Sequence, residues 1–410
     1  MTGEVLFLSH RIPFPPDRGD KIRSHHILKH IAPHAPVHVA TFADDEHDLA
    51  EEPALAELAA SHCLVERTKP LALAGAEAIV ARKPVSLTAF RSARLAHYVA
   101  RLIATRPIAT IYVFSGQMGQ YVPAGYSGRV VTDFVDVDSA KFEAYAAEGS
   151  GPRAWIDARE GRLLAAEEAR LAVRSKVSLL VSEAEAELFR ARLPLGVSAD
   201  VRAMGNGIDT AFFDPAAVSA EPAMLETAGP RLIFTGQMDY APNIAAAERA
   251  IGAILPRVRE RFADATFHVV GRNPPASLRA RHGQGGAYVW GRVADIRTWI
   301  KTADLALVPL SIGRGVQNKV LEAMAMERAV VLSGEAATGI AAADGRDFRV
   351  GRDDAALADA VCALLSSPER AQDIGRAARR YILTAANWDA QLRDLPAMLG
   401  LAEGAARNAA

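Results

Sequence analysis

The segment at residues 311–327, SIGRGVQNKVLEAMAME, carries residue types that bind phosphate. Gly313 and Gly315 allow tight backbone geometry and leave amide groups exposed where a helix begins. The free N–H groups and the dipole of such a helix start attract an anion. We therefore expect a diphosphate to bind here, with the cationic side chains of Arg314 and Lys319 neutralising its oxygens.

The spacing inside this helix separates polar side chains from apolar ones. Asn318 and Glu322 are four residues apart and therefore share one helix face. We expect that face to point into a cleft, where Glu322 accepts hydrogen bonds from ribose hydroxyls. Another face suits a protein core and carries Leu321, Met324 and Ala325. The alternative is an amphipathic helix whose Lys319 and Glu322 form a surface ion pair.

Short, almost continuous apolar runs alternate with helical segments rich in Ala, Leu, Glu and Arg. Such runs are typical of strands buried on both faces of a parallel sheet, and the alternation predicts a doubly wound α/β fold. The first series of predicted strands is Val5–Ser9, Val37–Phe42, Ile111–Phe114, Val130–Val135 and Leu179–Ser182. The second series is Arg231–Phe234, Thr266–Val270, Leu305–Pro309 and Ala329–Leu332.

Two series of strands predict two Rossmann-like domains that face a cleft. A stretch at 212–230 with three prolines and no helical periodicity marks the join. We expect an N-terminal domain at 1–215, a C-terminal domain at 216–386, and at 387–410 a helix that crosses back, followed by a tail of small residues. Ligands of open α/β sheets bind beyond the carboxyl ends of the strands, so the loops at those ends should form the site.

The first predicted strand is followed by a proline-rich loop and then by Asp17-Arg18-Gly19-Asp20. Gly19 opens a helix and would let a phosphate or an acceptor hydroxyl approach backbone amides. The plainer interpretation is a loop in which Asp17 or Asp20 caps the helix.

A pair of aspartates, Asp136 and Asp138, follows the predicted strand at 130–135 in the sequence DFVDVDS. Two carboxylates at this spacing can hold Mg²⁺ or Mn²⁺. Residues two apart on a strand also share a face, so the pair could instead bind acceptor hydroxyls. We favour the acceptor role and expect no metal and no other cofactor.

Several classes of function lack support. The formal net charge of −1 argues against a nucleic-acid partner. There is no P-loop, GxGxxG, HExxH or GxSxG motif, which argues against common ATPases, NAD enzymes, zincins and serine hydrolases. The two cysteines, Cys63 and Cys362, form no disulfide framework, and the apolar run at 5–8 is too short for a signal peptide. These features predict a cytoplasmic protein.

Segment 77–106 has six Lys or Arg residues and one Glu, with apolar residues interleaved. A basic amphipathic helix of this kind can lie on an anionic membrane. We expect peripheral contact with the inner face of the cytoplasmic membrane, or alternatively an ordinary helix pair with a solvated basic face.

The 311–327 segment resembles the donor-binding element of retaining GT-B glycosyltransferases of family 4. The stretches MGNGIDTAFFDP, FTGQMDYAPN, VVGRNP and VWGRVADI are similar to further elements of that family. The stretches LSHRIPFPPDRGDKIRSHHILKHI, VFSGQMGQYV, DFVDVDSAKFEAYA and LLVSEAEAELF resemble the subgroup associated with PEP-CTERM/exosortase exopolysaccharide systems.

The resemblance implies that Glu322 contacts the ribose of a nucleotide-sugar donor. The family usually has another glutamate where this chain has Arg314. The basic residues that follow the opening glycine, here Gly236, are also missing, so Arg272, Arg314 or Lys319 should bind the phosphates. Ser115 occupies the place where the family often has a cleft histidine.

The resemblance implies a hexosyltransferase-like enzyme that moves a sugar from a nucleotide-sugar donor to a glycan or a lipid-linked acceptor. Arg314 and Lys319 are the predicted catalytic residues, and Asp136, Asp138 and Ser115 the predicted acceptor-side residues. One alternative is a non-hydrolysing sugar-nucleotide epimerase, which also has two Rossmann-like domains. Another is a catalytically silent scaffold of polysaccharide assembly.

Overall fold

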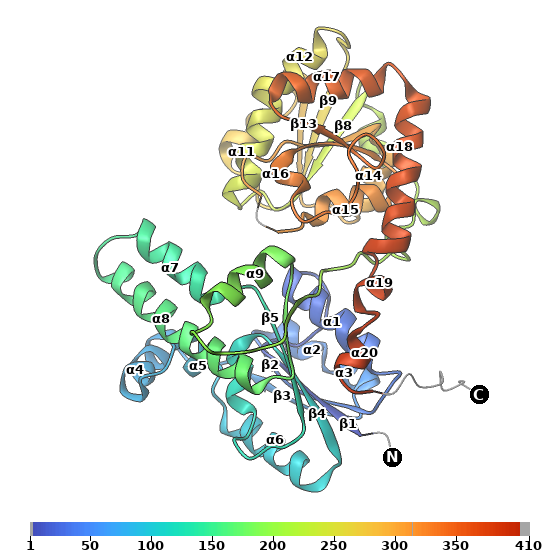
Figure 1. Ribbon diagram of the computed structural model, residues 1–410. Helices are drawn as coiled ribbons and strands as arrows, with labels where there is room; N and C mark the ends of the chain where they lie inside the picture. The colour runs from blue at the N-terminus through green and yellow to red at the C-terminus, as the bar shows by residue number, and fades with distance from the viewer. Residues whose placement is uncertain (1–2, 314, 402–410) are drawn as a thin grey trace, which may run out of the picture. The chain divides into compact units, whose positions relative to one another are not determined.

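The computed structural model describes residues 3–313 and 315–401. The chain divides into two compact units. The N-terminal unit comprises the residues up to Gly205 together with those from Leu392 on, and the C-terminal unit is Asn206–Gln391. Each unit is a parallel sheet with helices packed around it (Figure 1).

The described part of the N-terminal unit has a seven-stranded sheet in the order β3-β2-β1-β4-β5-β6-β7, with every neighbouring pair parallel. The strands are β1 (Glu4–Ser9), β2 (Val37–Ala43), β3 (Ser61–Glu66), β4 (Ile108–Phe114), β5 (Arg129–Val135), β6 (Val177–Leu180) and β7 (Val201–Ala203). The strand order reverses between β1 and β4. In an open α/β sheet, such a switch point is where a crevice forms at the carboxyl edge.

Helices cover the sheet of this unit and connect its strands. They are α1 (Gly19–Ile31), α2 (Glu46–Ala50), α3 (Glu52–Leu58), α4 (Leu71–Ala81), α5 (Val85–Ala89), α6 (Ala93–Thr105), the 3₁₀ helix η1 (Gly116–Tyr121), α7 (Asp138–Glu148), α8 (Gly151–Arg174) and α9 (Glu183–Arg192). The returning chain adds α20 (Leu395–Met398), and the carbonyls of Met398 and Leu399 accept hydrogen bonds from Arg129 and Thr110. No helix in the described residues is long and apolar enough to span a bilayer.

A buried ion pair joins α1 to the centre of the sheet. Arg23 donates from Nε to Asp133 at 2.9 Å and from its NH2 nitrogen at 3.2 Å, and both side chains are almost fully buried. The hydroxyl of Tyr112 donates to the same carboxylate at 2.8 Å. Arg23 also donates to the carbonyl of Gly205 at 3.2 Å, the last residue before the chain leaves this unit.

Segment 77–106 does not form the single amphipathic helix that its composition suggests. It contains the end of α4, then α5 and α6. The apolar side chains that would enter a membrane are mostly buried in the core of the unit, namely Leu87, Phe90, Leu95, Tyr98 and Leu102. The segment therefore follows the alternative interpretation, in which its apolar residues pack against the protein.

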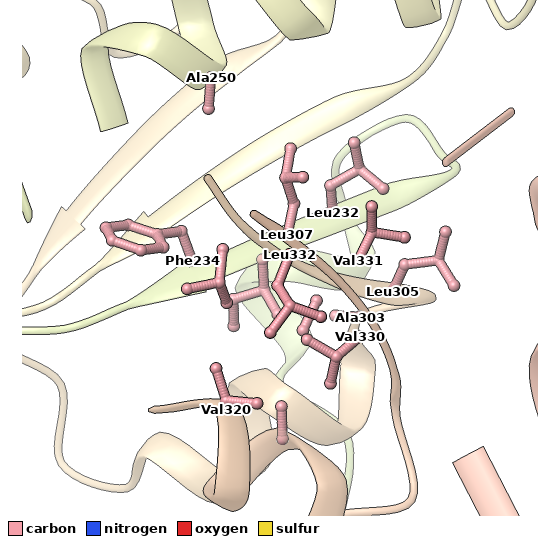
Figure 2. Close-up of a cluster of buried hydrophobic side chains, with 14 of the residues drawn as sticks. Leu232, Phe234, Ala250, Ala303, Leu305, Leu307, Val320, Val330, Val331 and Leu332 are labelled. Atoms are coloured by element: carbon pink, nitrogen blue, oxygen red, sulfur yellow. The ribbon is translucent and has the colours of Figure 1, made fainter. Parts of the chain in front are cut away.

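The described part of the C-terminal unit has a six-stranded parallel sheet in the order β10-β9-β8-β11-β12-β13. The strands are β8 (Arg231–Thr235), β9 (Thr266–Val270), β10 (Ala287–Gly291), β11 (Leu305–Val308), β12 (Ala329–Ser333) and β13 (Arg349–Gly351). Apolar side chains from β8, β11 and β12 meet in one cluster (Figure 2). Val320, from the helix α15 (Asn318–Ala325) that connects β11 to β12, packs against the same cluster. The switch point of this sheet lies between β8 and β11.

The helices of the C-terminal unit include α10 (Pro222–Leu225), α11 (Ala241–Arg249), α12 (Leu255–Arg259), α13 (Ala276–Arg279), α14 (Ile296–Thr302), α15 (Asn318–Ala325), α16 (Gly334–Ala337), α17 (Asp354–Leu365), α18 (Pro368–Tyr381) and α19 (Trp388–Leu392). Short 3₁₀ or π-helical turns are η2 (Pro215–Ala217), η3 (Ala250–Ile254) and η4 (Ile382–Ala386).

Residues 212–230, where the sequence suggests a join, pack on this unit. Lys301 donates to the carbonyls of Pro215 and Val218, and Arg379 donates to that of Phe213. Both sheets are doubly wound, which confirms the predicted fold class.

Candidate active site

The switch point of the C-terminal sheet brings two loops together. Gly236 follows β8, and the segment that includes Gly313 and Gly315 follows β11 and leads into α15. Because β8 and β11 are neighbours, their carboxyl ends lie at the same edge of the sheet. This is where a nucleotide is expected in a doubly wound domain.

Two glycines there leave no room for a side chain. A Cβ on Gly271, after β9, would lie 1.5 Å from the carbonyl oxygen of Gly236, and a Cβ on Gly313 would lie 2.0 Å from that of Glu335. Gly315 has a φ of 66°, in the left-handed region that favours glycine. The backbone of these loops is thus held close together by the absence of side chains.

Lys319, in the first turn of α15, lies beside Gly236 at this edge of the sheet. Its ammonium group contacts Gln317 Oε1 at 3.2 Å and lies 5.7 Å from the centre of the Phe234 ring. Burial lowers the pKa of Lys319, while the charge of Glu322 acts in the opposite direction. The cation is therefore partly stripped of water, which strengthens its attraction to an anionic ligand.

Glu322 lies one turn further along α15. Desolvation raises the pKa of its carboxyl group to about 7, and the charge of Lys319 counteracts that rise. The two side chains form no salt bridge in the described part of the chain, and both residues are half-buried. The alternative interpretation as a surface ion pair therefore does not fit the geometry.

The other face of α15 anchors it to the core, as the sequence predicts. Its buried residues are Val320, Leu321, Ala323, Met324 and Ala325. Asn318 is the first residue of the helix and is half-buried. Arg272, after β9, is exposed and its charge acts on the carboxylate of Asp239. Arg314 lies outside the described residues.

The switch point of the N-terminal sheet carries a histidine that the sequence analysis missed. His10 directly follows β1, and its ring stacks on Phe114 at the end of β4 with centroids 5.8 Å apart. Its Nε2 lies 3.3 Å from the carboxylate of Asp20, while Nδ1 is buried and makes no hydrogen bond within the described residues. Burial lowers the pKa of His10, although Asp20 acts against this effect. Its position directly after a predicted strand was the signal that could have identified it.

Charged side chains hold the loop around His10. Arg11 donates to Asp20 at 2.7 Å and to Asp44 at 2.6 Å. Despite desolvation, the pKa of Asp20 is lowered by its contacts with His10 and Arg11, and that of Asp44 by its contacts with Arg67 and Arg11. Gly19 begins α1, and a Cβ there would meet no atom within 4 Å. The side of Gly19 where a Cβ would stand is therefore open.

Ser115, at the end of β4, lies next to this loop. It has a φ of 73°, and its hydroxyl donates to Gln117 Oε1 at 2.7 Å. Ser115 N donates to the carbonyl of Asp133 at 2.8 Å, which fixes the turn on β5.

The two aspartates after β5 do not share a strand face, contrary to one expectation from their spacing. Asp136 lies in the turn beyond the strand, and Asp138 is the first residue of α7. Desolvation raises the pKa of Asp136 and of Asp138, with a further rise at Asp136 from Glu185. A proton on His10 would lower the pKa of Asp138, so the two side chains are close enough to interact electrostatically.

No group of three or more His, Cys, Asp or Glu side chains suited to a metal ion occurs among residues 3–313 and 315–401. The two switch-point sites are thus built from helix starts, cations, carboxylates and one histidine.

A family model matches part of the C-terminal unit. Residues 229–367 match the family model described as glycosyl transferases group 1. No curated protein matches the sequence.

Solved structures match over almost the whole chain. Sucrose-phosphate synthase from Thermosynechococcus elongatus is similar with a TM-score of 0.67 and 14% identity, over 97% of this chain and 98% of that chain. Anabaena HepE in complex with UDP-glucose has a TM-score of 0.61 and 13% identity, over 97% and 99%. WaaG, a glycosyltransferase involved in lipopolysaccharide biosynthesis, has a TM-score of 0.60 and 16% identity, over 98% and 100%.

These structures share the GT-B fold with this chain. Residues 229–367 are a group 1 glycosyltransferase domain, and the protein is a glycosyltransferase.

Proposed function

We propose that the protein transfers a sugar from a nucleotide-sugar donor to a glycan or lipid-linked acceptor, in the synthesis of an exopolysaccharide. The observation that carries this proposal is the arrangement at the C-terminal switch point, where Lys319 packs against Gly236 and lies one turn from Glu322, so that a desolvated cation and a desolvated carboxyl group are close together.

In this proposal the donor lies on the start of α15. The charges of Lys319 and Arg314 neutralise the diphosphate, Gly313, Gly315 and Asn318 offer backbone amides, and Glu322 accepts hydrogen bonds from the ribose. Arg272 assists at the phosphates. The complex of Anabaena HepE with UDP-glucose supports uridine diphosphate sugars as the first donors to test.

The acceptor is bound by the N-terminal unit. The residues proposed to face it are Ser115, Asp136, Asp138 and His10, with the open helix start at Gly19. His10 is neutral at physiological pH because burial lowers its pKa, and its contact with Asp20 holds the ring at the proposed acceptor side.

The transfer retains the configuration of the sugar and needs no metal. As the bond to the leaving diphosphate breaks, the sugar becomes oxocarbenium-like and negative charge grows on the phosphate oxygens. Lys319, Arg314 and the amides of the helix start stabilise that charge more in the transition state than in the ground state. The protein works in the cytoplasm, with peripheral contact to the inner face of the membrane.

The experiment is a thermal-shift screen of nucleoside diphosphates and nucleotide sugars, followed by an assay of sugar transfer. A true donor at 100 times its Kd should stabilise the fold by about 2.7 kcal/mol. Transfer with retained configuration supports the proposal. Isomerised nucleotide sugar without an acceptor would instead indicate an epimerase, and binding without transfer or donor hydrolysis would indicate a silent scaffold.

A further inference from the structure

Helix α4 has an unusual solvent face. Every residue of α4 that is exposed is apolar: Leu71, Ala72, Leu73, Ala76, Ile79, Val80 and Ala81. Ala74 and Ala78 face the protein, so the helix is apolar on both sides. An exposed surface helix is normally polar on its outer face. The apolar side chains on the outer face of α4 are therefore not covered by any other part of the unit that the structure describes.

Two exposed apolar side chains of α8 lie near α4. Arg159 of α8 donates to the carbonyls of Ala78 at 2.8 Å and Lys83 at 3.2 Å, which ties α8 to the end of α4. Trp155 and Ile156 precede Arg159 by four and three residues, so they lie on the same side of α8. Both are exposed, Trp155 by 64%. Figure 1 shows α4 and α8 as neighbours at the periphery of the N-terminal unit.

The shape and charge of this surface favour a bilayer over a protein groove. Val80 is 86% exposed, so its side chain stands out from the surface. Arg82 and Lys83 follow α4 directly, are exposed, and make no ion pair in the part of the chain that the structure describes. The one acidic residue of α4, Glu77, is paired with Lys69 at 2.9 Å.

From these observations we infer that α4 and the first turns of α8 dock the N-terminal unit on an anionic lipid bilayer. Leu73, Ile79, Val80, Trp155 and Ile156 enter the boundary between headgroups and acyl chains, while Arg82 and Lys83 contact the headgroup phosphates. The basic helix α6 takes no direct part, because its apolar side chains are buried. The inference adds a surface to the proposed membrane contact and does not depend on the identity of donor or acceptor.

Trp155 provides a direct signal for this surface. All four tryptophans lie in the described residues, and Trp155 alone is exposed. The probe is a vesicle of phosphatidylcholine with an equal part of phosphatidylglycerol, compared with phosphatidylcholine alone. We expect the protein to float with the anionic vesicles, with a shift of its tryptophan emission to shorter wavelength that Trp155→Phe abolishes.

The decisive variant is Leu73→Gln/Ile79→Gln/Val80→Gln. These side chains are exposed and glutamine is a good helix former, so the fold should survive. We expect the partition coefficient on anionic vesicles to fall at least about tenfold. Val173→Gln, an exposed residue near the other end of α8, and Arg94→Gln/Arg101→Gln on α6 should bind as the wild type does.

Unchanged vesicle binding by the triple variant would overturn the inference. So would a dimer that the triple variant abolishes while vesicles leave the Trp155 emission unshifted, because a second copy would then cover this face. Donor hydrolysis measured without vesicles separates the two proposals: the triple variant should keep it, whereas a protein that is not a transferase lacks it in every variant.

Discussion

The glycine at 236 and the lysine at 319 are packed against each other across the C-terminal switch point. A Cβ on Gly236 would lie 3.2 Å from Cε of Lys319 and 2.9 Å from Nδ2 of Asn243. The glycine at 236 therefore leaves room for the side chain of Lys319, and this relationship can be tested from both sides.

Gly236→Ala should damage the site more than the fold. The φ of 151° is costly for alanine, and the new methyl group must push Asn243 or Lys319 aside. We expect a loss of about 1–3 kcal/mol in the free energy of unfolding and a fall in nucleotide affinity. Chemical denaturation and calorimetry measure the two effects. Gly252→Ala in the same unit, where a Cβ meets nothing within 4 Å, is the control. Equal affinity in both variants would separate Gly236 from the donor site.

Lys319→Ala should lower kcat more than it raises KM. Negative charge on the diphosphate is greatest as it leaves, so the ammonium group of Lys319 stabilises the transition state more than the bound donor. We expect kcat to fall by roughly 10²–10³-fold in steady-state transfer assays, and Arg314→Ala to act in the same direction. If KM alone rises, the lysine binds the donor without assisting its departure.

Glu322 should make nucleotide binding dependent on pH. Its ordinary pKa of 4.5 is raised to about 7, so the carboxyl group is largely protonated at pH 6 and ionised at pH 8. Affinity for a nucleoside diphosphate should therefore rise between pH 6 and pH 8. Glu322→Gln should lose about 1.5–3 kcal/mol of binding at pH 8. Because the nucleotide itself also titrates, the pH profile of Glu322→Gln measured with the same ligand is the control, and an identical profile would contradict the assignment.

The raised pKa of Glu322 should also make the stability of the protein depend on pH. Between about pH 4.5 and pH 7 the folded state keeps a proton on Glu322 that the unfolded chain releases. The free energy of unfolding should therefore fall as pH rises through this window. Melting curves of the wild type and Glu322→Gln should converge toward acid pH and diverge, with the variant more stable, near neutrality.

His10→Asn should weaken the acceptor side selectively. It removes the buried Nδ1 from the N-terminal switch point and leaves α15 unchanged. We expect a rise of about tenfold in the KM for acceptor, corresponding to about 1.4 kcal/mol, with donor affinity preserved. The exposed histidine of α2, in His47→Asn, serves as the comparison. A parallel loss of donor binding would point to a general defect in the fold.

Transfer should persist in EDTA, since cationic side chains and helix amides neutralise the leaving group. Full loss of activity that Mn²⁺ restores, together with inactivation by Asp136→Asn, would favour metal binding at Asp136 and Asp138 instead.

The strands that the sequence did not reveal have one property in common. They are β3, β7, β10 and β13, the edges of the two sheets. Interior strands such as VVTDF and LALV are covered on both faces and read as apolar runs, whereas edge strands such as VRA and RVG are short and partly exposed. A continuous apolar run indicates a strand that is buried on both faces. Edge strands are less buried, so their sequences show this pattern less clearly.

The site shows the same dependence on tertiary context. The division of α15 into a core face and a polar face follows from helical spacing alone. The stacking of His10 on Phe114 depends on the pairing of β1 with β4, which are separated by about a hundred residues, and no local pattern encodes it. The burial of Leu95 and Tyr98 likewise required the sheet beneath α6.

The buried network of Arg23, Asp133 and Tyr112 has an evolutionary consequence. Removing one partner of a buried ion pair leaves an uncompensated charge, a cost of about 3–5 kcal/mol that exceeds a large part of the stability of a typical domain. Selection should therefore remove single substitutions at these positions. Related sequences should either keep both Arg23 and Asp133 or have replaced both. A family alignment in which positions 23 and 133 change in concert would be the historical trace of the contact that anchors Gly205.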